Sequence, residues 1–435
     1  MTRTPEEIHT DVFRAYFDAR RHKRGTPSQI SFEMDLERNL SSLCDEICSR
    51  TYHPSAGMCF ITRRPVQREI FASPFRDRVV HHLLYNYINP VFDRLMIHDC
   101  YSCRSGKGTL EGVRRIEHHI RSCSDNFTRD AYVLKLDLRG YFMSIDKSIL
   151  YDIISRGLRR HPDGLDQGLC DYLVRSLLFR DPSLNVKVLG SGGDWEGLPP
   201  SKSLLKSAPG VGLPIGDLTS QLFSNIYLNE LDQWVKRSLH CRHYGRYVDD
   251  FFIIDESREH LLSLVPKIRS FLKDELRATL HPDKVYIQHV SKGVQFLGAR
   301  SLPHRRLPSG RTVSSFLARV REYESELRFW VPPERVRRMS RTLNSYLGCF
   351  QHYDMHGMLE SVLGASPLRR VLRFSPGYSK TAVRAGTGSA GLDRFQGCLW
   401  PGGCQTPPSL PPAVEKNDVY NNDIARLGFQ AGANG

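Results

Sequence analysis

Residues 244–255, YGRYVDDFFIID, predict two short strands joined by a tight turn that carries two adjacent acids, Asp249 and Asp250. Aromatic and β-branched residues flank the acids on both sides, which is typical of strands. A second β-rich run, AYVLKLD at 131–137, ends in another acid, Asp137. Because such strands alternate with helical segments along the chain, the pattern predicts an α+β fold in which helices back a central sheet.

Adjacent carboxylates in an apolar hairpin are costly, because their like charges repel and desolvation raises their pKa. Divalent cations that bridge the carboxylates would relieve that cost. Magnesium favours a few carboxylates together with substrate phosphate oxygens. Two such ions about 4 Å apart can activate an attacking hydroxyl and stabilise the leaving oxygens of an in-line phosphoryl transfer. Two adjacent aspartates taken alone are more often a solvated turn or a helix cap, so the surrounding sequence must decide.

The chain has 435 residues, which is enough for two or three packed units. Its formal net charge is +14, from 61 Lys and Arg against 47 Asp and Glu. A nucleic-acid partner accounts for this excess, since phosphate contacts supply most sequence-independent affinity, and a solvated basic surface is the alternative. No apolar run of roughly 18 residues exists, so we expect no membrane partner, and the N-terminus lacks the pattern of a secretory signal.

Eleven cysteines are scattered through the chain, which does not match a disulfide framework and favours a reducing, cytoplasmic location. Two close pairs stand out, Cys44 with Cys48 and Cys100 with Cys103. A zinc site needs about four convergent ligands, and no partner pair follows at a matching interval. Buried thiols are therefore the expected role of these cysteines.

Six segments resemble, in order, the sequence motifs of reverse transcriptases. YVDD at 247–250 resembles their YxDD box, VLKLDLRGYFMSID at 133–146 their first palm motif, and GLPIGDLTSQLFSNIYLNELD at 212–232 the motif beneath the incoming base pair. The fingers motifs and the primer-grip strands resemble ITRRPVQREIFASPFRDRVVHH at 61–82, YSCRSGKGT at 101–109 and VQFLGARSLP at 294–303.

The resemblance implies a right-hand polymerase fold with fingers, a palm with an antiparallel sheet, and a helical thumb. The expected divisions are N-terminal helices and fingers at 1–130, the palm with part of the fingers at 131–300, the thumb at 301–374, and a poorly ordered, low-complexity tail at 375–435. A Gly, Pro and Ser-rich stretch at about 189–211 is predicted to be a mobile loop inserted into the palm.

The resemblance also implies which residues carry the chemistry. Asp137, Asp249 and Asp250 would be catalytic and would hold two Mg²⁺ ions, with Mn²⁺ as the alternative ion. The backbone carbonyl of Leu138 would be a further metal ligand.

Three residues are assigned to the incoming nucleotide on the same basis. Arg68 would hold the triphosphate as a fixed charge. Phe142 aligns with the bulky residue that blocks a ribose 2′-hydroxyl, which predicts DNA as the product, and core packing is its alternative role. Gly216 would let the backbone approach the nucleotide closely.

The remaining basic residues of the fingers are assigned to phosphates. Arg104 and Lys107 would contact the template, with a solvated basic loop as the alternative. Val66 stands where the family often has Lys, so Arg63 or Arg64 would have to supply the second triphosphate contact. Basic helices within 312–363 would track a heteroduplex through its backbone, with an ordinary charged helix face as the alternative.

The segment from Ile215 to Gln221 has the form IGxxxSQ, where most bacterial retroelement polymerases have QGxxxSP. This form resembles the reverse transcriptases of diversity-generating retroelements, which copy a template-repeat RNA with errors at adenines. Both end residues would belong to the nucleotide pocket. Isoleucine cannot make the hydrogen bond that an amide would offer near the sugar and base pair, and losing a contact that tightens around a correct pair weakens discrimination.

The subgroup implies mutagenic retrohoming in a bacterial host cell, with dNTPs, a template-repeat RNA, a cDNA/RNA heteroduplex and a small basic helical accessory variability protein as partners. Two alternatives stay open. One is a group II intron-like or retron-type reverse transcriptase, against which the IGxxxSQ box and the missing maturase domain argue. The other is a polymerase-fold RNA-binding or defence protein without templated synthesis, against which the three acids argue.

Overall fold

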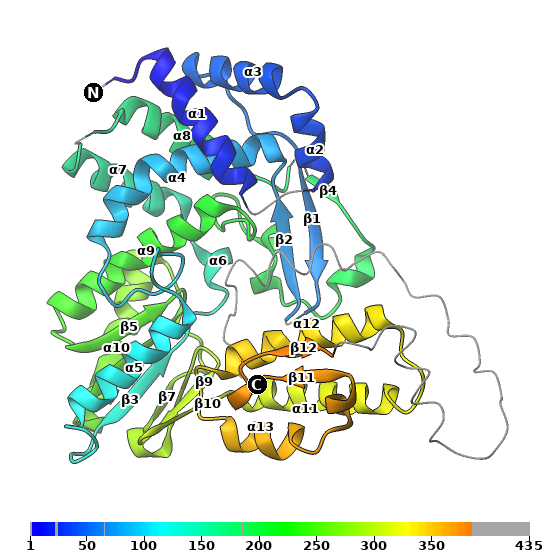
Figure 1. The fold of residues 1–435 in the computed structure, drawn as a ribbon. Helices are drawn as coiled ribbons and strands as arrows, with labels where there is room; N and C mark the ends of the chain where they lie inside the picture. Colours follow the sequence, from blue (N-terminus) through cyan, green and yellow to red (C-terminus); the bar gives the residue numbers. More distant parts are fainter. Residues whose placement is uncertain (1, 22–24, 65, 163, 185, 385–435) are drawn as a thin grey trace. The chain divides into compact units, whose positions relative to one another are not determined.

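The computed structural model describes residues 2–21, 25–64, 66–162, 164–184 and 186–384. The chain divides into two compact units, the first ending at His289 and the second beginning at Val290 (Figure 1). The predicted boundary between palm and thumb at residue 301 falls within a strand of the second unit, β9 (Ala299–Leu302).

Helices make up most of the first unit, and their starts follow ordinary capping chemistry. The first helix begins after Thr4, whose side chain accepts from the Glu7 N–H while the Glu7 carboxylate accepts from the Thr4 N–H. The helices are α1 (Pro5–Arg20), α2 (Pro27–Glu33), α3 (Leu36–Cys48), α4 (Phe75–Leu95), α5 (Thr109–Cys123), α6 (Tyr141–Ser144), α7 (Lys147–Arg160), α8 (Gln167–Leu178), α9 (Leu218–Arg237) and α10 (Arg258–Leu276).

The central sheet of this unit has four antiparallel strands in the order β5-β6-β3-β7. They are β5 (His243–Tyr247), β6 (Asp250–Asp255), β3 (Tyr132–Leu136) and β7 (Tyr286–His289). Helices α5, α9 and α10 pack on this sheet, so the predicted α+β fold with an antiparallel palm sheet is confirmed. Leu136 pairs with Phe251, and this register places Asp137 beside the start of β6.

A smaller sheet joins distant parts of the unit in the order β2-β1-β4. Two of its strands, β1 (Gly57–Thr62) and β2 (Arg68–Ala72), are antiparallel neighbours in the chain, and β4 (Val186–Val188) runs parallel to β1. The stretch 189–211, predicted to be a mobile loop, instead contains the short 3₁₀ turns η1 (Gly192–Trp195), η2 (Pro200–Lys202) and η3 (Leu204–Lys206). The composition of this stretch gives no indication of the contacts that it makes with residues far away in the sequence.

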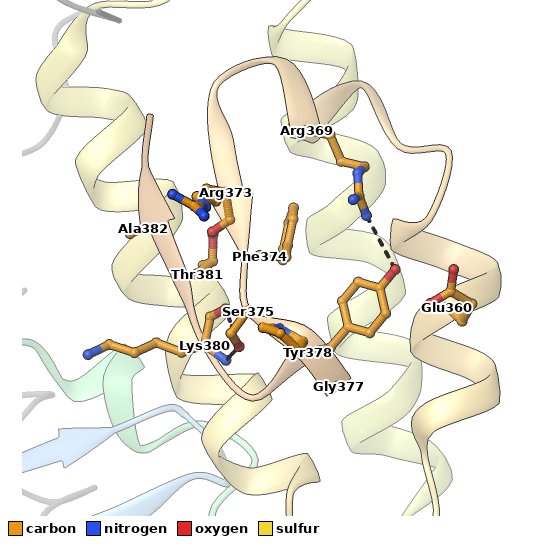
Figure 2. A pocket seen from close by; sticks show the side chains of 11 residues that line it. Glu360, Arg369, Arg373, Phe374, Ser375, Gly377, Tyr378, Lys380, Thr381 and Ala382 are labelled. Atoms are coloured by element: carbon orange, nitrogen blue, oxygen red, sulfur yellow. Dashed lines mark hydrogen bonds between the residues drawn. The ribbon is translucent and has the colours of Figure 1, made fainter. Parts of the chain in front are cut away.

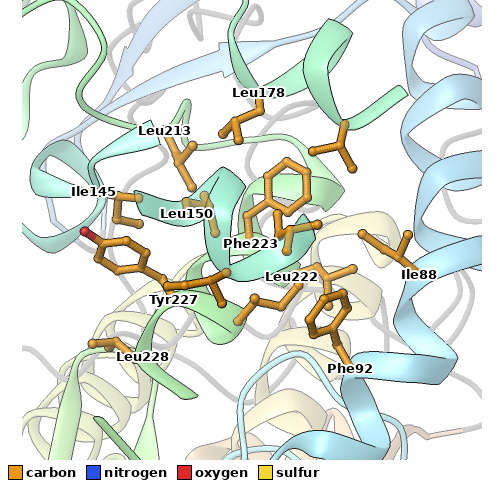
Figure 3. Close-up of a cluster of buried hydrophobic side chains, with 14 of the residues drawn as sticks. Ile88, Phe92, Ile145, Leu150, Leu178, Leu213, Leu222, Phe223, Tyr227 and Leu228 are labelled. Carbon is orange, nitrogen blue, oxygen red and sulfur yellow. The ribbon is translucent and has the colours of Figure 1, made fainter. Parts of the chain in front are cut away.

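The core of the first unit lies between α4 and α9, which cross beside α7. Leu222 of α9 lies beside Ile88 and Phe92 of α4 in the buried cluster of Figure 3, which also contains Phe223 of α9. A Cβ at Gly157 of α7 would overlap the Phe92 ring, so glycine allows the helices this close approach. Truncating a buried leucine in such a core costs about 2–5 kcal/mol.

The second unit has its own core, centred on Phe316, Leu343 and Leu347. Its elements are the three-stranded sheet β8 (Val294–Phe296), β9 and β10 (Arg305–Pro308), the helices α11 (Gly310–Glu326), α12 (Pro333–Phe350) and α13 (His356–Leu363), the turns η4 (Val290–Lys292), η5 (Pro367–Arg370) and η6 (Pro376–Tyr378), and the hairpin β11 (Leu372–Phe374) with β12 (Thr381–Val383). The predicted helical character of 312–363 is confirmed.

The prediction of a poorly packed tail from residue 375 is wrong for its first ten residues. Residues 375–384 complete the β11–β12 hairpin, and Tyr378 is buried in the core of the second unit. A single aromatic anchor among Gly, Ser and Lys residues gives too weak a pattern for sequence-based prediction. The rest of the predicted tail, 385–435, lies outside the described residues. Among the described residues, no helix combines the length and apolarity that a bilayer crossing requires.

Candidate active site

The turn between β5 and β6 carries the two adjacent acids, as predicted. Tyr247 pairs with Asp250, so Val248 and Asp249 form a two-residue turn. Val248 has φ +56°, a left-handed conformation that is rare for a β-branched side chain and costs on the order of 1–3 kcal/mol. Something in the surrounding structure must therefore hold this turn.

Arg246 stabilises the turn through a hydrogen bond to it and an ion pair with α9. Its guanidinium is fully buried and forms a two-pronged ion pair with Asp232 of α9, with Nη2–Oδ2 at 2.6 Å and Nε–Oδ1 at 2.7 Å. Its Nη1 donates to the carbonyl oxygen of Val248 at 2.9 Å. Tyr244 also donates to Asp232, at 2.6 Å. The strained residue is thus anchored to α9 by a buried charge pair that the sequence analysis missed.

The three predicted catalytic acids influence one another electrostatically. Burial and then the charge of Asp137 raise the pKa of Asp249 to about 7. Burial also raises the pKa of Asp250 to about 6, with Asp137 adding to the shift and Lys135 opposing it. Raised pKa values in half-buried carboxylates mark a site that is short of positive charge, which is the electrostatic situation predicted for a cation site.

Two lysines, both missed in the sequence analysis, lie against the acids. Lys284 donates from Nζ to Oδ2 of Asp137 at 2.7 Å. The Nζ of Lys135 lies 3.9 Å from Oδ2 of Asp250, and this lysine is buried on β3. A lysine two positions before an acid on an apolar strand was a usable signal for Lys135, because it must share one face of the strand with that acid. Lys284 is remote in sequence and gave no comparable signal.

The donor set suits a hard divalent cation, since it consists of carboxylate oxygens at neighbouring ends of the two central strands, β3 and β6. In the arrangement described, Asp137 and Asp250 face the two lysines, and among the described residues no three His, Cys, Asp or Glu side chains are gathered closely enough to hold a metal ion. The residue types therefore fit the predicted ions, and the assignment of metal ligands stays a prediction.

The backbone around Leu138 pairs with residues 279–281, and the predicted metal-ligand role of the Leu138 carbonyl stays a prediction. The Arg139 N–H donates to Thr279, and the His281 N–H donates to the carbonyl of Asp137, on either side of a bridge between Leu138 and Leu280. Because backbone groups alternate along an extended chain, the Leu138 carbonyl points away from the Leu280 segment. Sequence alone could not give this direction.

Two of the predicted nucleotide-pocket residues come together. Phe142 and Ile215 are both half-buried and pack against one small apolar cluster that includes Phe71 of β2. The Phe142 carbonyl accepts from the Leu213 N–H at 2.8 Å. Gly216 has φ +142°, and a Cβ there would overlap the Phe71 carbonyl oxygen, so the close approach that this glycine permits is to β2. Its approach to a nucleotide stays a prediction.

Arg68 lies within electrostatic range of Asp249, and its triphosphate contact stays a prediction. It is half-buried on β2, and although burial lowers its pKa, the negative charge of Asp249 opposes that shift. Of the two residues considered in place of the missing lysine at Val66, Arg63 forms an exposed ion pair with Asp194 at 2.8 Å. The second triphosphate contact is therefore not assigned by the structure.

Arg104 has a structural role that competes with the predicted template contact. Its Nε donates to the Asp93 carboxylate at 2.6 Å, and its Nη atoms donate to the backbone carbonyls of Asp93 in α4, at 2.9 Å, and of Ile97 just after α4, at 2.7 Å. Its side chain is only 10% exposed. Lys107 lies more openly, with Nζ 3.1 Å from a ring nitrogen of His98, and remains available as a predicted template contact.

Gln221 lies on α9 and accepts from the Cys103 thiol at 3.1 Å, which links the two predicted motifs at 101–109 and 212–232. Cys44 and Cys100 are buried as expected, whereas Cys103 is exposed. Neither cysteine pair belongs to a metal cluster among the described residues.

Comparisons with known proteins show which family the chain belongs to. Residues 67–301 match the family described as reverse transcriptase (RNA-dependent DNA polymerase). Protein YkfC of Escherichia coli strain K12 is 24% identical over 347 residues, which are 72% of this chain and 80% of that protein. Telomerase from Candida albicans, solved with a TWJ fragment of telomeric RNA, is 14% identical with a TM-score of 0.42, over 74% of this chain and 58% of that one. Apo telomerase from Candida tropicalis is 10% identical with a TM-score of 0.42, over 71% and 59%. The chain thus spans less than two thirds of either telomerase chain.

Proposed function

The chain belongs to the reverse transcriptase family, and from that premise we propose that it is the RNA-directed DNA polymerase of a diversity-generating retroelement. It makes error-prone cDNA, mutated at adenines, from a template-repeat RNA. The observation that carries the polymerase activity is the strand register that sets Asp137 beside the turn of Asp249 and Asp250.

Each part of the site has a task in nucleotidyl transfer. Asp137, Asp249, Asp250 and the Leu138 carbonyl would hold the divalent ions that the family generally uses, and Mg²⁺ would suit their oxygen chemistry. When bound, such ions activate the primer 3′-hydroxyl and stabilise the leaving pyrophosphate. Arg68 orients the triphosphate as a fixed positive charge near Asp249.

Sugar and base selection rest on uncharged residues. Phe142 excludes a ribose 2′-hydroxyl by its bulk, so the product is DNA. Ile215 offers no polar contact to the correct pair, so a wrong pair is penalised less. Because both side chains belong to one apolar cluster, the two kinds of selection occur in the same pocket wall.

A nucleic-acid partner accords with the basic character of the chain, which has a formal net charge of +14. In the second unit, a cavity of about 570 Å³ is lined by the basic residues Arg369, Arg373 and Lys380 and by Phe374 (Figure 2). Cations beside an aromatic ring suit phosphate and base contacts. We further infer a small basic accessory protein and a cytoplasmic location in a bacterial host from the resemblance of the IGxxxSQ box.

A primer-extension assay tests the polymerase activity. The purified chain, an RNA template, a DNA primer, dNTPs and Mg²⁺ should give extended DNA, and Asp249→Asn should abolish it. Asp255→Asn is the matched control, since Asp255 ends the same strand at its far end, opposite Tyr132. Undiminished extension by Asp249→Asn would overturn the catalytic assignment of Asp249. No extension by the wild-type chain would favour a polymerase-fold protein without templated synthesis.

Sequencing the cDNA tests the retroelement subtype. Errors should concentrate at template adenines, and Ile215→Gln should reduce them. A uniform error spectrum would favour the intron-like or retron-type alternative while leaving the polymerase assignment intact. Equal adenine error rates in the two forms would contradict the role of Ile215.

A further inference from the structure

The segment 186–206 packs against Phe142 and Ile215, the two residues proposed to select the nucleotide, through a shared apolar cluster. It contributes Leu204, which is buried, and Val186 and Trp195, which are half-buried, to the apolar cluster. The same cluster contains the two selecting residues, Phe142 and Ile215. The other members are Cys59, Phe71 and Met143.

A single buried carboxylate fastens this segment to the fingers strand. Glu69 of β2 is fully buried and accepts from Trp195 Nε1 at 2.8 Å, Ser203 Oγ at 2.7 Å and the Leu204 N–H at 2.6 Å. A weaker bond from the Leu205 N–H, at 3.3 Å, completes the set. A buried carboxylate is tolerated only when its oxygens are satisfied, so these bonds make the attachment specific.

Further contacts fix the segment on both sides of the pocket. Gln67 of the β1–β2 turn donates from Nε2 to the carbonyls of Asp194 at 2.8 Å and Glu196 at 3.0 Å. On the opposite side, Gly140 has φ +57°, and a Cβ there would overlap the Ser201 carbonyl oxygen. Gly140 immediately precedes α6, the helix that carries Phe142. The segment therefore touches both the strand of Arg68 and the helix of the sugar-selecting ring.

We propose that segment 186–206 is the backing that sets nucleotide selectivity, and that Glu69 and Leu204 are its positioning residues. This inference rests on the proposed polymerase function. Steric rejection of a 2′-hydroxyl works only if the Phe142 ring cannot yield, because a ring free to move back would admit ribose. Leu204 fills the space into which the cluster would otherwise relax, and Glu69 keeps Leu204 in place through its backbone N–H.

Single-nucleotide incorporation by the full chain tests the proposal. The measured quantity is the ratio of kcat/KM for a dNTP to kcat/KM for the matching rNTP, together with misincorporation of wrong dNTPs. Leu204→Ala should lower the ratio about tenfold, which is the scale on which one lost apolar contact alters selection. Glu69→Gln should act in the same direction, because an amide nitrogen cannot accept from the Leu204 N–H.

Matched controls come from the same segment. Leu205 is the neighbouring leucine, 38% exposed and outside the cluster, so Leu205→Ala should leave the ratio unchanged. Leu204→Met conserves volume and should restore most of the selectivity lost in Leu204→Ala. If Glu69→Gln does not fold, the Leu204 pair still decides the outcome.

The outcomes separate selectivity from stability and from the activity itself. A folded Leu204→Ala chain that loses dNTP and rNTP incorporation equally, or keeps the wild-type ratio, would overturn the inference and leave the proposed function standing. A wild-type chain that incorporates no nucleotide on any primed template would overturn the proposed function and this inference with it. A lowered ratio with measurable dNTP incorporation, rescued by Leu204→Met, supports the proposal.

Discussion

Removing either member of the buried pair Arg246–Asp232 should destabilise the first unit and disorganise the turn that carries Asp249. Both side chains are fully buried, and Arg246 also supports the carbonyl of the strained Val248. Breaking a buried ion pair by removing one partner costs about 3–5 kcal/mol, because the other charge stays buried without compensation. Arg246→Met and Asp232→Asn should therefore each lower the free energy of unfolding by that amount.

The double variant makes the reasoning quantitative. Arg246→Met with Asp232→Asn removes both charges, so it should cost about as much as one single variant, and the coupling energy should be about 3 kcal/mol. Urea-unfolding curves of the four chains measure it. Additive single effects, within about 0.5 kcal/mol, would show that the two residues act independently and would refute the pairing as an energetic unit.

Activity separates the support of the turn from general stability. A displacement of about 1 Å in a catalytic group can cost roughly 100-fold in rate, so folded Arg246→Met should lose kcat on that scale. Glycine adopts φ near +56° without strain, so adding Val248→Gly should recover part of the lost kcat without restoring the free energy of unfolding. Unchanged kcat in folded Arg246→Met would refute the role of Arg246 in holding the turn.

Burial lowers the pKa of both His82 and His243 from 6.5 to about 4. Between these two pH values the folded state therefore binds fewer protons than the unfolded state. The contribution of both histidines to stability should be fully present above pH 6.5 and should be lost as the pH falls toward 4. At pH 5 each histidine should lower the free energy of unfolding by about 2 kcal/mol relative to its value above pH 6.5. His82→Gln should therefore flatten the pH dependence of the urea-unfolding midpoint. An unaltered slope would contradict the lowered pKa of His82. Gly216→Ala should destabilise the chain by at least about 1–3 kcal/mol and lower activity, because its Cβ would meet the Phe71 carbonyl, whereas Gly192→Ala, which meets nothing within 4 Å, should have little effect.

The elements that sequence patterns predicted correctly are those whose cause is local. Helices were predicted within 312–363, and α12 (Pro333–Phe350) and α13 (His356–Leu363) lie there. Two β-rich runs around adjacent acids predict a hairpin, and β5 and β6 meet in a two-residue turn there. In each case the neighbouring residues already contain the deciding information.

Sequence patterns missed the contacts whose partners are remote in the chain. Composition made 189–211 look like a mobile loop, yet Trp195 bonds to Glu69, which lies 126 residues earlier in the sequence. Arg104 looked like a free basic residue, yet its guanidinium is bound to Asp93 and to the end of α4. The environment of Gly, Ser and charged residues depends on partners that are remote in the sequence. Local composition therefore does not predict their contacts.

The sequence by itself determined the residue types of the site. Three acids, at the end of one strand and in the turn of a hairpin, specify oxygen donors and a need for positive charge wherever they are brought together. The tertiary structure decided which basic groups lie beside these acids and which residue supports the turn. The strand register sets Asp137 beside Asp250, the fold brings Lys284 to Asp137, and Arg246 reaches α9 to hold the turn. These outcomes depend on distances between segments far apart in the chain, and such distances are fixed only in the folded protein.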